Sequence, residues 1–400
     1  MEFLLINHPL DCPICDQGGE CELQDLSMGY GASISRFSEK KRVVKDKNIG
    51  PLIATDMTRC IHCTRCVRFG IEVAGMKELG ATGRGEHMEI GTYIEQAVSS
   101  EMSGNVIDLC PVGALTSKPF RYTARPWELE SRAAIAAHDC VGSNVTVHVR
   151  RGKVMRVVPR ENESINETWI SDRDRFSYQG LDADDRLLAP MVRKNGEWET
   201  ASWDEALAAA VSGLKGVIGR YGPAQVGALV SPSATLEEYY LLQKLMRGIG
   251  SNHIDHRLRQ LDFTDQEGAP AYPWLGQDIA DLERVNSVLL IGSNVRKDQP
   301  IIAHRLRKAA LNGASIATVN PIDYDFHFPV ADKIVTTPVG MERGLAAIAK
   351  ALLAERGAKS PAPDGFNALT KDVTCDAVHK RIASSLLAAK NATVLFGLGA

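Results

Sequence analysis

The cysteines are the residues best suited to do chemistry, and their spacing is the most informative feature of the sequence. Seven of the nine lie before residue 111. One run reads Cys60-x2-Cys63-x2-Cys66, which puts three thiolates on one tight loop that can cap a face of a cubane. A cysteine followed by proline, as at Cys110, has the form that closes ferredoxin-type sites. Structural zinc usually takes its ligands in two separated pairs. We therefore assign one 4Fe–4S cluster to Cys60, Cys63, Cys66 and Cys110.

An earlier set supplies one imidazole and three thiolates, from His8, Cys12, Cys15 and Cys21. Taken alone, this set fits zinc nearly as well as iron–sulfur, and the histidine could be a bystander. A second cluster nearby in sequence favours a second 4Fe–4S site and an electron-transfer role. Neutral imidazole in place of thiolate leaves such a site one charge less negative, which should change its potential. Gly18 and Gly19 would let backbone N–H groups approach the cluster, or they form a plain turn.

Composition limits the remaining functions. The chain has 400 residues, enough for two to four domains, with 44% hydrophobic and 24% charged residues and a formal net charge of −3. This charge favours neither nucleic acid nor an anionic membrane surface as a partner. No apolar run approaches the ~18 residues that a membrane span needs. Nine cysteines with tight spacings fit metal ligation in a reducing compartment better than a disulfide framework.

The elements that must position these ligands change along the chain, and we predict four domains. Residues 1–48 and 49–129 carry the two ligand sets, with a helix over 94–98, and little in them has the periodicity of a large core. Ligand binding often holds such small domains together. Residues 130–187 form a β-rich segment, in which 145–149 and 154–158 flank Arg151-Gly152-Lys153 as a hairpin.

Residues 188–400 alternate strands with helices, which predicts an α/β domain with a parallel sheet. The expected strands are 225–230, 285–292, 314–319 and 392–397. The expected helices are 203–220, 236–248, 301–312 and 342–356, the first with Asp204 and Glu205 in its first turn. The last strand ends close to residue 400, so we expect this domain to be truncated.

Four stretches closely resemble the large iron–sulfur subunits (the G or 75 kDa type) of respiratory complex I, NADH:quinone oxidoreductase. The stretches are His8–Asp25, Asp56–Phe69, Ile90-Gly-Thr-Tyr and Cys110–Pro119. The similarity continues through Trp169-Ile-Ser-Asp and Arg175-Phe-Ser-Tyr into the α/β region. It covers essentially the whole chain, and the first 120 residues are the most specific part.

The resemblance implies that both ligand sets carry 4Fe–4S clusters, which pass electrons from NADH-reduced flavin towards quinone. This chain would then be an electron-transfer subunit of the oxidoreductase (a translocase), without a catalytic site of its own. Its partners would be the flavin-side and quinone-side subunits of the peripheral arm, with no nucleic acid and no membrane insertion. The location would be the cytoplasmic face of a bacterial inner membrane or the mitochondrial matrix side. Family members begin with a 2Fe–2S domain, which we expect upstream of Met1.

The α/β region resembles molybdopterin oxidoreductases such as formate dehydrogenase. Their metal-binding residue would correspond to Leu261, which cannot ligate molybdenum, so we expect a scaffold without molybdopterin. A further cluster near the start of this half would need four cysteines, but only Cys140 is present there, so we expect no such cluster. The alternatives are a molybdenum-dependent formate dehydrogenase and an iron-only hydrogenase, which needs more cysteines than remain after residue 110.

Other conspicuous residues have ordinary explanations. His253, His256, Arg257 and Arg259 are either remnants of a pterin pocket or, as we favour, a solvated basic face. Cys140 and Cys375 are expected to be inert buried thiols. His62, between ligands, is expected to be a neighbouring donor or an exposed residue. The turn that follows Ile291 could bind a phosphate or simply connect a strand to a helix.

Overall fold

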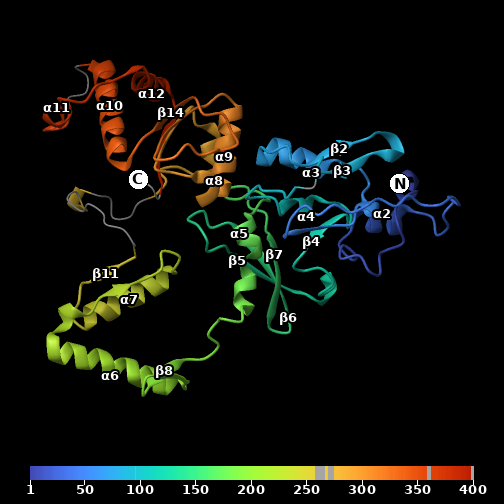
Figure 1. Ribbon diagram of the computed structural model, residues 1–400, viewed down its shortest axis with the longest axis horizontal. Coiled ribbons are helices and arrows are strands. Elements are labelled where there is room, and N and C mark those ends of the chain that lie inside the picture. Colours follow the sequence, from blue (N-terminus) through green and yellow to red (C-terminus); the bar gives the residue numbers. More distant parts are fainter. Residues whose placement is uncertain (95, 257–265, 269–273, 358–361, 398–400) are drawn as a thin grey trace. The chain divides into compact units, whose positions relative to one another are not determined.

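A computed structural model describes the chain except for residues 95, 257–265, 269–273, 358–361 and 398–400 (Figure 1). The described chain divides into two compact units. The first unit combines residues 1–178 with 275–400, and the second contains residues 179–274. This division is coarser than the four predicted domains, whose boundaries stay predictions.

Short elements separated by loops carry the two ligand sets in the first unit. Strand β1 (Ile53–Thr55) pairs antiparallel with β4 (Leu115–Ser117), and the Asp56 N–H donates to the Ala114 carbonyl at 2.9 Å. This pairing places the chain before Cys60 beside the chain after Cys110. The other elements of this region are α1 (Glu2–Leu5), α2 (Glu22–Tyr30), η1 (Met57–Arg59), α3 (Arg65–Arg68), η2 (Phe69–Ala74), β2 (Gly80–Thr82), η3 (Gly85–His87), β3 (Glu89–Gly91) and α4 (Asn105–Leu109).

A three-stranded antiparallel sheet follows, formed by β5 (Glu130–Ile135), β6 (Asn144–Arg150) and β7 (Lys153–Pro159). Arg151 and Gly152 both have positive φ, 52° and 77°, as the two central residues of a type I′ hairpin turn require. The helix α5 (Asp172–Phe176) begins at Ser171, whose hydroxyl accepts from the Asp174 N–H. The hairpin predicted from the sequence is confirmed.

The first unit also contains a four-stranded parallel sheet with the order β14-β13-β12-β15. The strands are β12 (Ser287–Ile291), β13 (Ser315–Asn320), β14 (Asp332–Val335) and β15 (Ala392–Phe396). The central strand β12 is buried along its whole length, as a strand covered on both faces must be.

The two faces of this sheet belong to different cores. Val288 and Leu290 join the main core, which includes residues of α9 (Pro300–Leu311) and of the ligand-bearing region. Leu289 and Ile291 pack on the opposite face in a core with residues of α10 (Pro338–Arg356) and α12 (Ala377–Ala388). Because alternate side chains of a strand point to opposite faces, this strand connects both cores. The ligand-bearing region is therefore packed onto the same core as one face of the sheet.

The second unit contains two long helices and two small sheets. Helix α6 (Trp203–Tyr221) begins with a capping box in which Ser202 and Glu205 exchange hydrogen bonds, and α7 (Leu236–Gly248) begins with one between Thr235 and Glu238. The sheets are the antiparallel pair β8 (Met191–Lys194) and β9 (Glu197–Thr200), and the parallel pair β10 (Ala228–Leu229) and β11 (Ile254–Asp255).

Most predicted elements are confirmed, with shifted ends. The helix predicted over 94–98 is wrong, since the described residues of this stretch form a bend and an irregular segment instead. Its Val98 N–H donates to the Ile49 carbonyl, so the backbone is satisfied across the chain rather than along a helix. The strand predicted over 225–230 shortens to Ala228–Leu229, because Pro223–Gln225 forms a 3-10 turn. The parallel α/β architecture is confirmed.

Candidate metal centres

The second ligand set surrounds a single pocket. All four predicted thiols, together with apolar residues such as Met57, Ile90 and Leu115, line it. In the loop that carries three of them, His62 and Thr64 have positive φ of 55° and 59°, and these left-handed turns let the loop fold back around the pocket. The fourth ligand follows α4 directly. The thiols that the structure brings together here are Cys60, Cys63, Cys66 and Cys110.

The electrostatics of this pocket favour a bound cationic group. Burial raises the pKa of Cys66 to about 12, and repulsion from Cys110, Cys60 and Cys63 adds to the effect. Burial likewise raises the pKa of Cys110 to about 11, although the backbone N–H groups of the following residues oppose the shift. Four thiolates in an apolar pocket repel one another unless iron compensates their charge. The donor set and its surroundings therefore fit a 4Fe–4S cluster.

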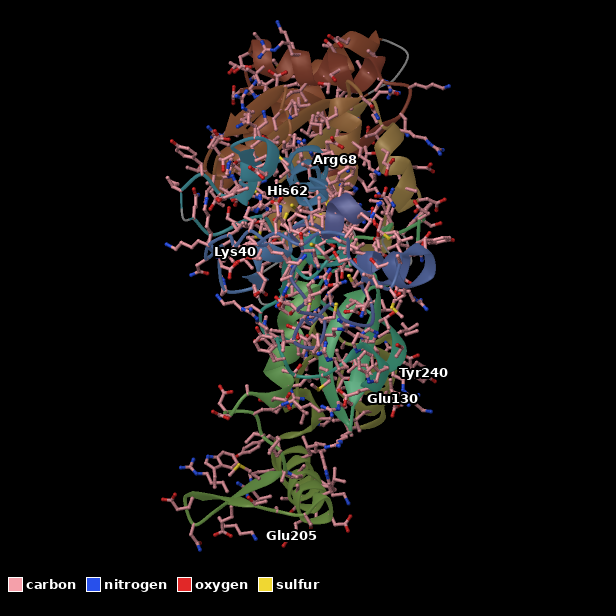
Figure 2. The ribbon with its side chains drawn as sticks, turned by 90° about the vertical axis from the view of Figure 1, so that its right-hand side faces the viewer. Lys40, His62, Arg68, Glu130, Glu205 and Tyr240 are labelled. Atoms are coloured by element: carbon pink, nitrogen blue, oxygen red, sulfur yellow. The ribbon has the colours of Figure 1, made fainter. Side chains whose placement is uncertain are left out.

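Backbone N–H groups point at these sulfurs, as they do around iron–sulfur clusters. The His62 N–H lies 3.4 Å from Cys60 Sγ. The His62 ring itself turns to Arg42, with 3.1 Å between His62 Nε2 and Arg42 Nη2. Figure 2 labels His62 and Arg68 on this part of the chain. The prediction that His62 is a neighbouring donor agrees with its backbone contact.

The first ligand set lies on a compact series of turns that leads into α2. The Cys15 N–H donates to the Asp11 carbonyl at 2.8 Å, and the Gly18 N–H donates to the Cys15 carbonyl at 3.0 Å. Cys21 is the residue at which α2 begins, and its Sγ accepts from the Gln24 N–H at 3.4 Å. Burial raises the pKa of Cys21, although the backbone N–H groups of the first turn of the helix oppose this shift. Cys15 and Cys21 are buried, whereas Cys12 is exposed.

His8 has the features of a metal ligand. Its Nδ1 is buried and has no hydrogen-bond partner among the residues that the structure describes, an arrangement that costs free energy unless something binds this atom. Burial lowers the pKa of His8, although the Arg59 carbonyl opposes the shift, and this favours the neutral imidazole that ligation requires. These observations fit a ligand role for His8 at the first set.

The two ligand sets adjoin through the segment that follows Cys110. The Pro111 carbonyl lies 3.6 Å from Cys21 Sγ. A Cβ atom placed on Gly113 would lie only 2.1 Å from Cys15 Sγ, so only glycine fits at this position. The segment Cys110–Gly113 thus contains a ligand of the second set and packs against two ligands of the first.

The sequence did not reveal the residues that hold the two sets together. Gly113 shows no turn signal, and its role comes from contact with a residue almost a hundred positions away. Arg59 is one of many arginines, yet it is buried with 3% of its surface exposed. Gly18 and Gly19 form a turn, as one reading predicted, because the Gly19 N–H donates to Gln24 Oε1 at 3.0 Å and is not available to a cluster.

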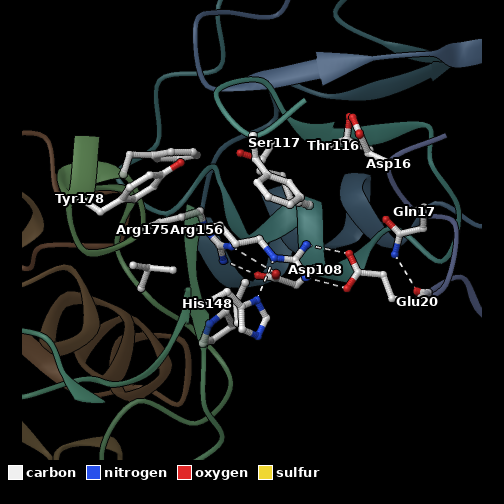
Figure 3. Close-up of a pocket in the computed structure, with 16 residues that line it drawn as sticks. Asp16, Gln17, Glu20, Asp108, Thr116, Ser117, His148, Arg156, Arg175 and Tyr178 are labelled. Carbon is white, nitrogen blue, oxygen red and sulfur yellow. Dashed lines mark hydrogen bonds and ion pairs between the residues drawn. The ribbon is translucent and has the colours of Figure 1, made fainter. Parts of the chain in front are cut away.

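A cavity of about 310 Å³ lies beside the first set and is lined by Asp16, Gln17 and Glu20 from the loop between its ligands (Figure 3). Arg156 of β7 reaches across it and forms two hydrogen bonds to the Glu20 carboxylate, at 2.7 and 2.8 Å. Its Nε also donates to His148 Nδ1 at 2.9 Å. These bonds anchor the first ligand loop to the β6–β7 hairpin.

Other predicted features have mixed outcomes. Cys140 is exposed and Cys375 half-buried, so the expectation of buried thiols is wrong for Cys140, which lies in the loop between β5 and β6. In the turn after β12, the Ser293 N–H donates to Asn320 Oδ1 at 2.8 Å, which supports the simple connecting turn.

The proposed pterin-pocket remnants lie in the second unit. His253 and His256 are exposed, in agreement with a solvated face. Arg257, Arg259 and Leu261 lie outside the described residues. Among the described residues, no three His, Cys, Asp or Glu side chains converge as the ligands of a single metal ion would.

Four family models match successive segments of the chain. They are the NADH-ubiquinone oxidoreductase-G iron-sulfur binding region (residues 1–36), the ferredoxin-like domain of NADH-quinone oxidoreductase subunit 3 (50–116), the NADH-ubiquinone oxidoreductase NDSU1/NuoG-like 4Fe-4S domain (129–179) and molybdopterin oxidoreductase (186–362). The third segment contains only one cysteine, Cys140, so it does not fit a further 4Fe–4S cluster held by four thiolates.

Curated relatives agree with these models. The G subunit of NADH-quinone oxidoreductase from Rickettsia felis is 49% identical over 323 residues, which cover 79% of this chain and 47% of the relative. The chain is a relative of the G subunit of NADH-quinone oxidoreductase. The G subunit from Rickettsia bellii is 50% identical over 309 residues, covering 76% of this chain and 44% of its own. The NADH-ubiquinone oxidoreductase 75 kDa subunit of Reclinomonas americana is 45% identical over 339 residues, with 80% and 48% covered.

The chain spans about half the length of these relatives. Among solved structures, acetylene hydratase from Pelobacter acetylenicus is 18% identical, with a TM-score of 0.49 over 66% of this chain and 40% of its own. This similarity is too weak to assign a function. Among the helices that the structure describes, none has the length and apolar character needed to cross a membrane.

Proposed function

We propose that this chain transfers electrons within an NADH:quinone oxidoreductase of the complex I type, between NADH-reduced flavin and quinone. The proposal rests mainly on the pocket that Cys60, Cys63, Cys66 and Cys110 share. The identity to the Rickettsia G subunits supports the same role. Catalysis would belong to the assembled complex, and this chain would supply no catalytic site of its own.

Two 4Fe–4S clusters are the proposed cofactors. Cys60, Cys63, Cys66 and Cys110 would hold one, and His8, Cys12, Cys15 and Cys21 would hold the other. A bound cluster supplies one-electron exchange. The residues of the chain would position each cluster, surround the second one with apolar side chains, and direct backbone N–H groups at the sulfurs, as the His62 N–H does at Cys60. Zinc at the first set remains the alternative that metal analysis distinguishes.

The α/β region is proposed to be a scaffold without molybdopterin. The position that corresponds to the metal-binding residue of the enzymes carries Leu261 in the sequence. We also propose the domain boundaries 1–48, 49–129, 130–187 and 188–400. The proposed partners are the flavin-side and quinone-side subunits of the peripheral arm. The proposed location is the cytoplasmic face of a bacterial inner membrane, or the matrix side of a mitochondrial one.

The test is anaerobic iron, sulfide, zinc and molybdenum analysis of the reconstituted full-length protein, with low-temperature EPR. Cys63→Ala and Cys12→Ala should each remove about four irons and four sulfides, whereas the control Cys140→Ala should remove none. Stoichiometric zinc in place of iron at both sets would contradict electron transfer. Zinc at the first set alone would reduce the proposal to a single cluster, and bound molybdenum would restore an enzymatic role to the α/β region.

A further inference from the structure

Arg59 lies where the two ligand sets meet. It directly precedes Cys60 of the second set, yet its guanidinium turns towards the first. Arg59 Nε donates to Asp11 Oδ2 at 3.0 Å, and Asp11 directly precedes Cys12. Its Nη1 lies 3.4 Å from the Gly113 carbonyl. The side chain is almost completely buried, so its charge acts with little screening by water.

The positive charge of Arg59 lies close to the ligands of the first set. The Cβ position of Gly113 lies 3.6 Å from Arg59 Cδ and 2.1 Å from Cys15 Sγ, which places the arginine close to a ligand sulfur. The Arg59 carbonyl also faces the His8 imidazole. Three residues of the first ligand loop therefore interact with this one arginine.

Arg59 belongs to a small network in which charges balance. Asp56 accepts from Arg59 at 3.1 Å and from Arg121 at 2.8 Å, so two arginines face the two carboxylates Asp11 and Asp56. Removing Arg59 would leave one excess negative charge beside the first set. Removing the charge of Asp11 would leave one excess positive charge there.

We propose that Arg59 is a positioning residue that raises the reduction potential of the first site. A reduced cluster carries one more negative charge than an oxidised one, so a nearby buried cation favours the reduced form. The inference rests on the proposed function, because it requires a redox cluster at the first set. It makes Arg59 the group that adjusts how readily that site accepts an electron.

The test is an EPR-monitored redox titration of the assembled complex that carries substitutions in this chain. In Arg59→Met, the ratio of reduced to oxidised first cluster at the wild-type midpoint should fall about tenfold, which equals about 59 mV for a one-electron couple. Asp11→Asn should shift the potential in the opposite direction. Arg59→Lys keeps the charge and should stay near the wild-type value. The matched control is Arg65→Met, which removes an arginine that is 39% exposed and should shift the potential much less.

The opposite shifts distinguish charge from structure, because a purely structural role of Arg59 predicts no upward shift in Asp11→Asn. Equal shifts in Arg59→Met and Arg65→Met would overturn the inference. So would loss of the first-site signal in both Arg59→Met and Arg59→Lys. If only Arg59→Met loses the signal, Asp11→Asn decides, and an unchanged or lower potential rejects the proposal. A wild-type complex without a first-site signal would reject the proposed function instead.

Discussion

The two ligand sites differ in the residues that surround their cysteine thiols. At the second site, four thiols line an apolar pocket, and Cys66 and Cys110 belong to the main hydrophobic core, as does Cys21 of the first site. At the first site, Cys12 is exposed and one donor is an imidazole. Charged side chains approach the first site closely, with Arg59 beside Cys15 and Arg125 donating to the Cys15 carbonyl at 2.6 Å.

This difference indicates which forces control each site. Burial and backbone N–H groups dominate at the second site, and such features change little unless the core itself changes. Burial also acts on Cys15 and Cys21 at the first site, but there buried ion pairs such as that of Arg59 with Asp11 lie beside the ligands, so single substitutions of charge should alter this site. The second site should therefore contribute more to stability, and the first should respond more to nearby charge.

The largest effect is expected where the two sites touch. Gly113→Ala would place a methyl group 2.1 Å from Cys15 Sγ, closer than any contact allows, so this ligand must move. We expect the first site to lose most of its iron, about four atoms per chain, while the second keeps its own. Iron analysis with EPR of each cluster measures this. The control Gly29→Ala, where the added methyl meets no atom of the described residues within 4 Å, should keep both clusters.

The second-largest effect is expected on the free energy of unfolding, which should depend more on the ligands of the second site than on those of the first. Cys66→Ser removes a ligand from the main core, and we expect the free energy of unfolding of the full-length protein to fall by more than about 4 kcal/mol. Cys12→Ser removes an exposed ligand and should cost about 1–3 kcal/mol. Cys375→Ser, which can keep the hydrogen bond to the Ala347 carbonyl, is the control with little change. Equal losses at Cys66 and Cys12 would contradict the contrast in burial.

The sequence indicated that the four thiols of the second set would come together, as they do around one pocket, because the signal is local. Three ligands share one loop, and the fourth stands beside a proline. The helices α6 and α7 could also be predicted from the sequence, since capping residues and apolar spacing are local signals too. The contacts between the two ligand sets could not be predicted from the sequence, because Gly113 and Cys15 are far apart along the chain. The wrong prediction of a helix at 94–98 has the same cause, because the Val98 N–H of this stretch donates to the Ile49 carbonyl, which is distant in sequence.

The imidazole offers a way to make the first site resemble the second. His8→Cys would replace a neutral ligand by a thiolate and add one negative charge. A unit charge ~4 Å away in a medium with an effective dielectric of ~20 is worth about 4 kcal/mol, so the potential should fall by on the order of 100 mV. Redox titration of the first cluster measures the shift. His62→Gln is the control, since that ring faces Arg42, and an unshifted His8→Cys would show that His8 is no ligand.

The smallest effect is expected at a second arginine between the sites. Arg65 precedes Cys66 and pairs with Glu22, which follows Cys21, at 2.8 Å. It joins the same two ligand sets as Arg59, but both partners are substantially exposed, and exposed pairs contribute about 0–1 kcal/mol. Glu22→Gln should therefore lower the free energy of unfolding by less than about 1 kcal/mol, and added salt should remove the difference. A loss as large as that of Cys12→Ser would mean that surface charge, and not burial, holds the two sites together.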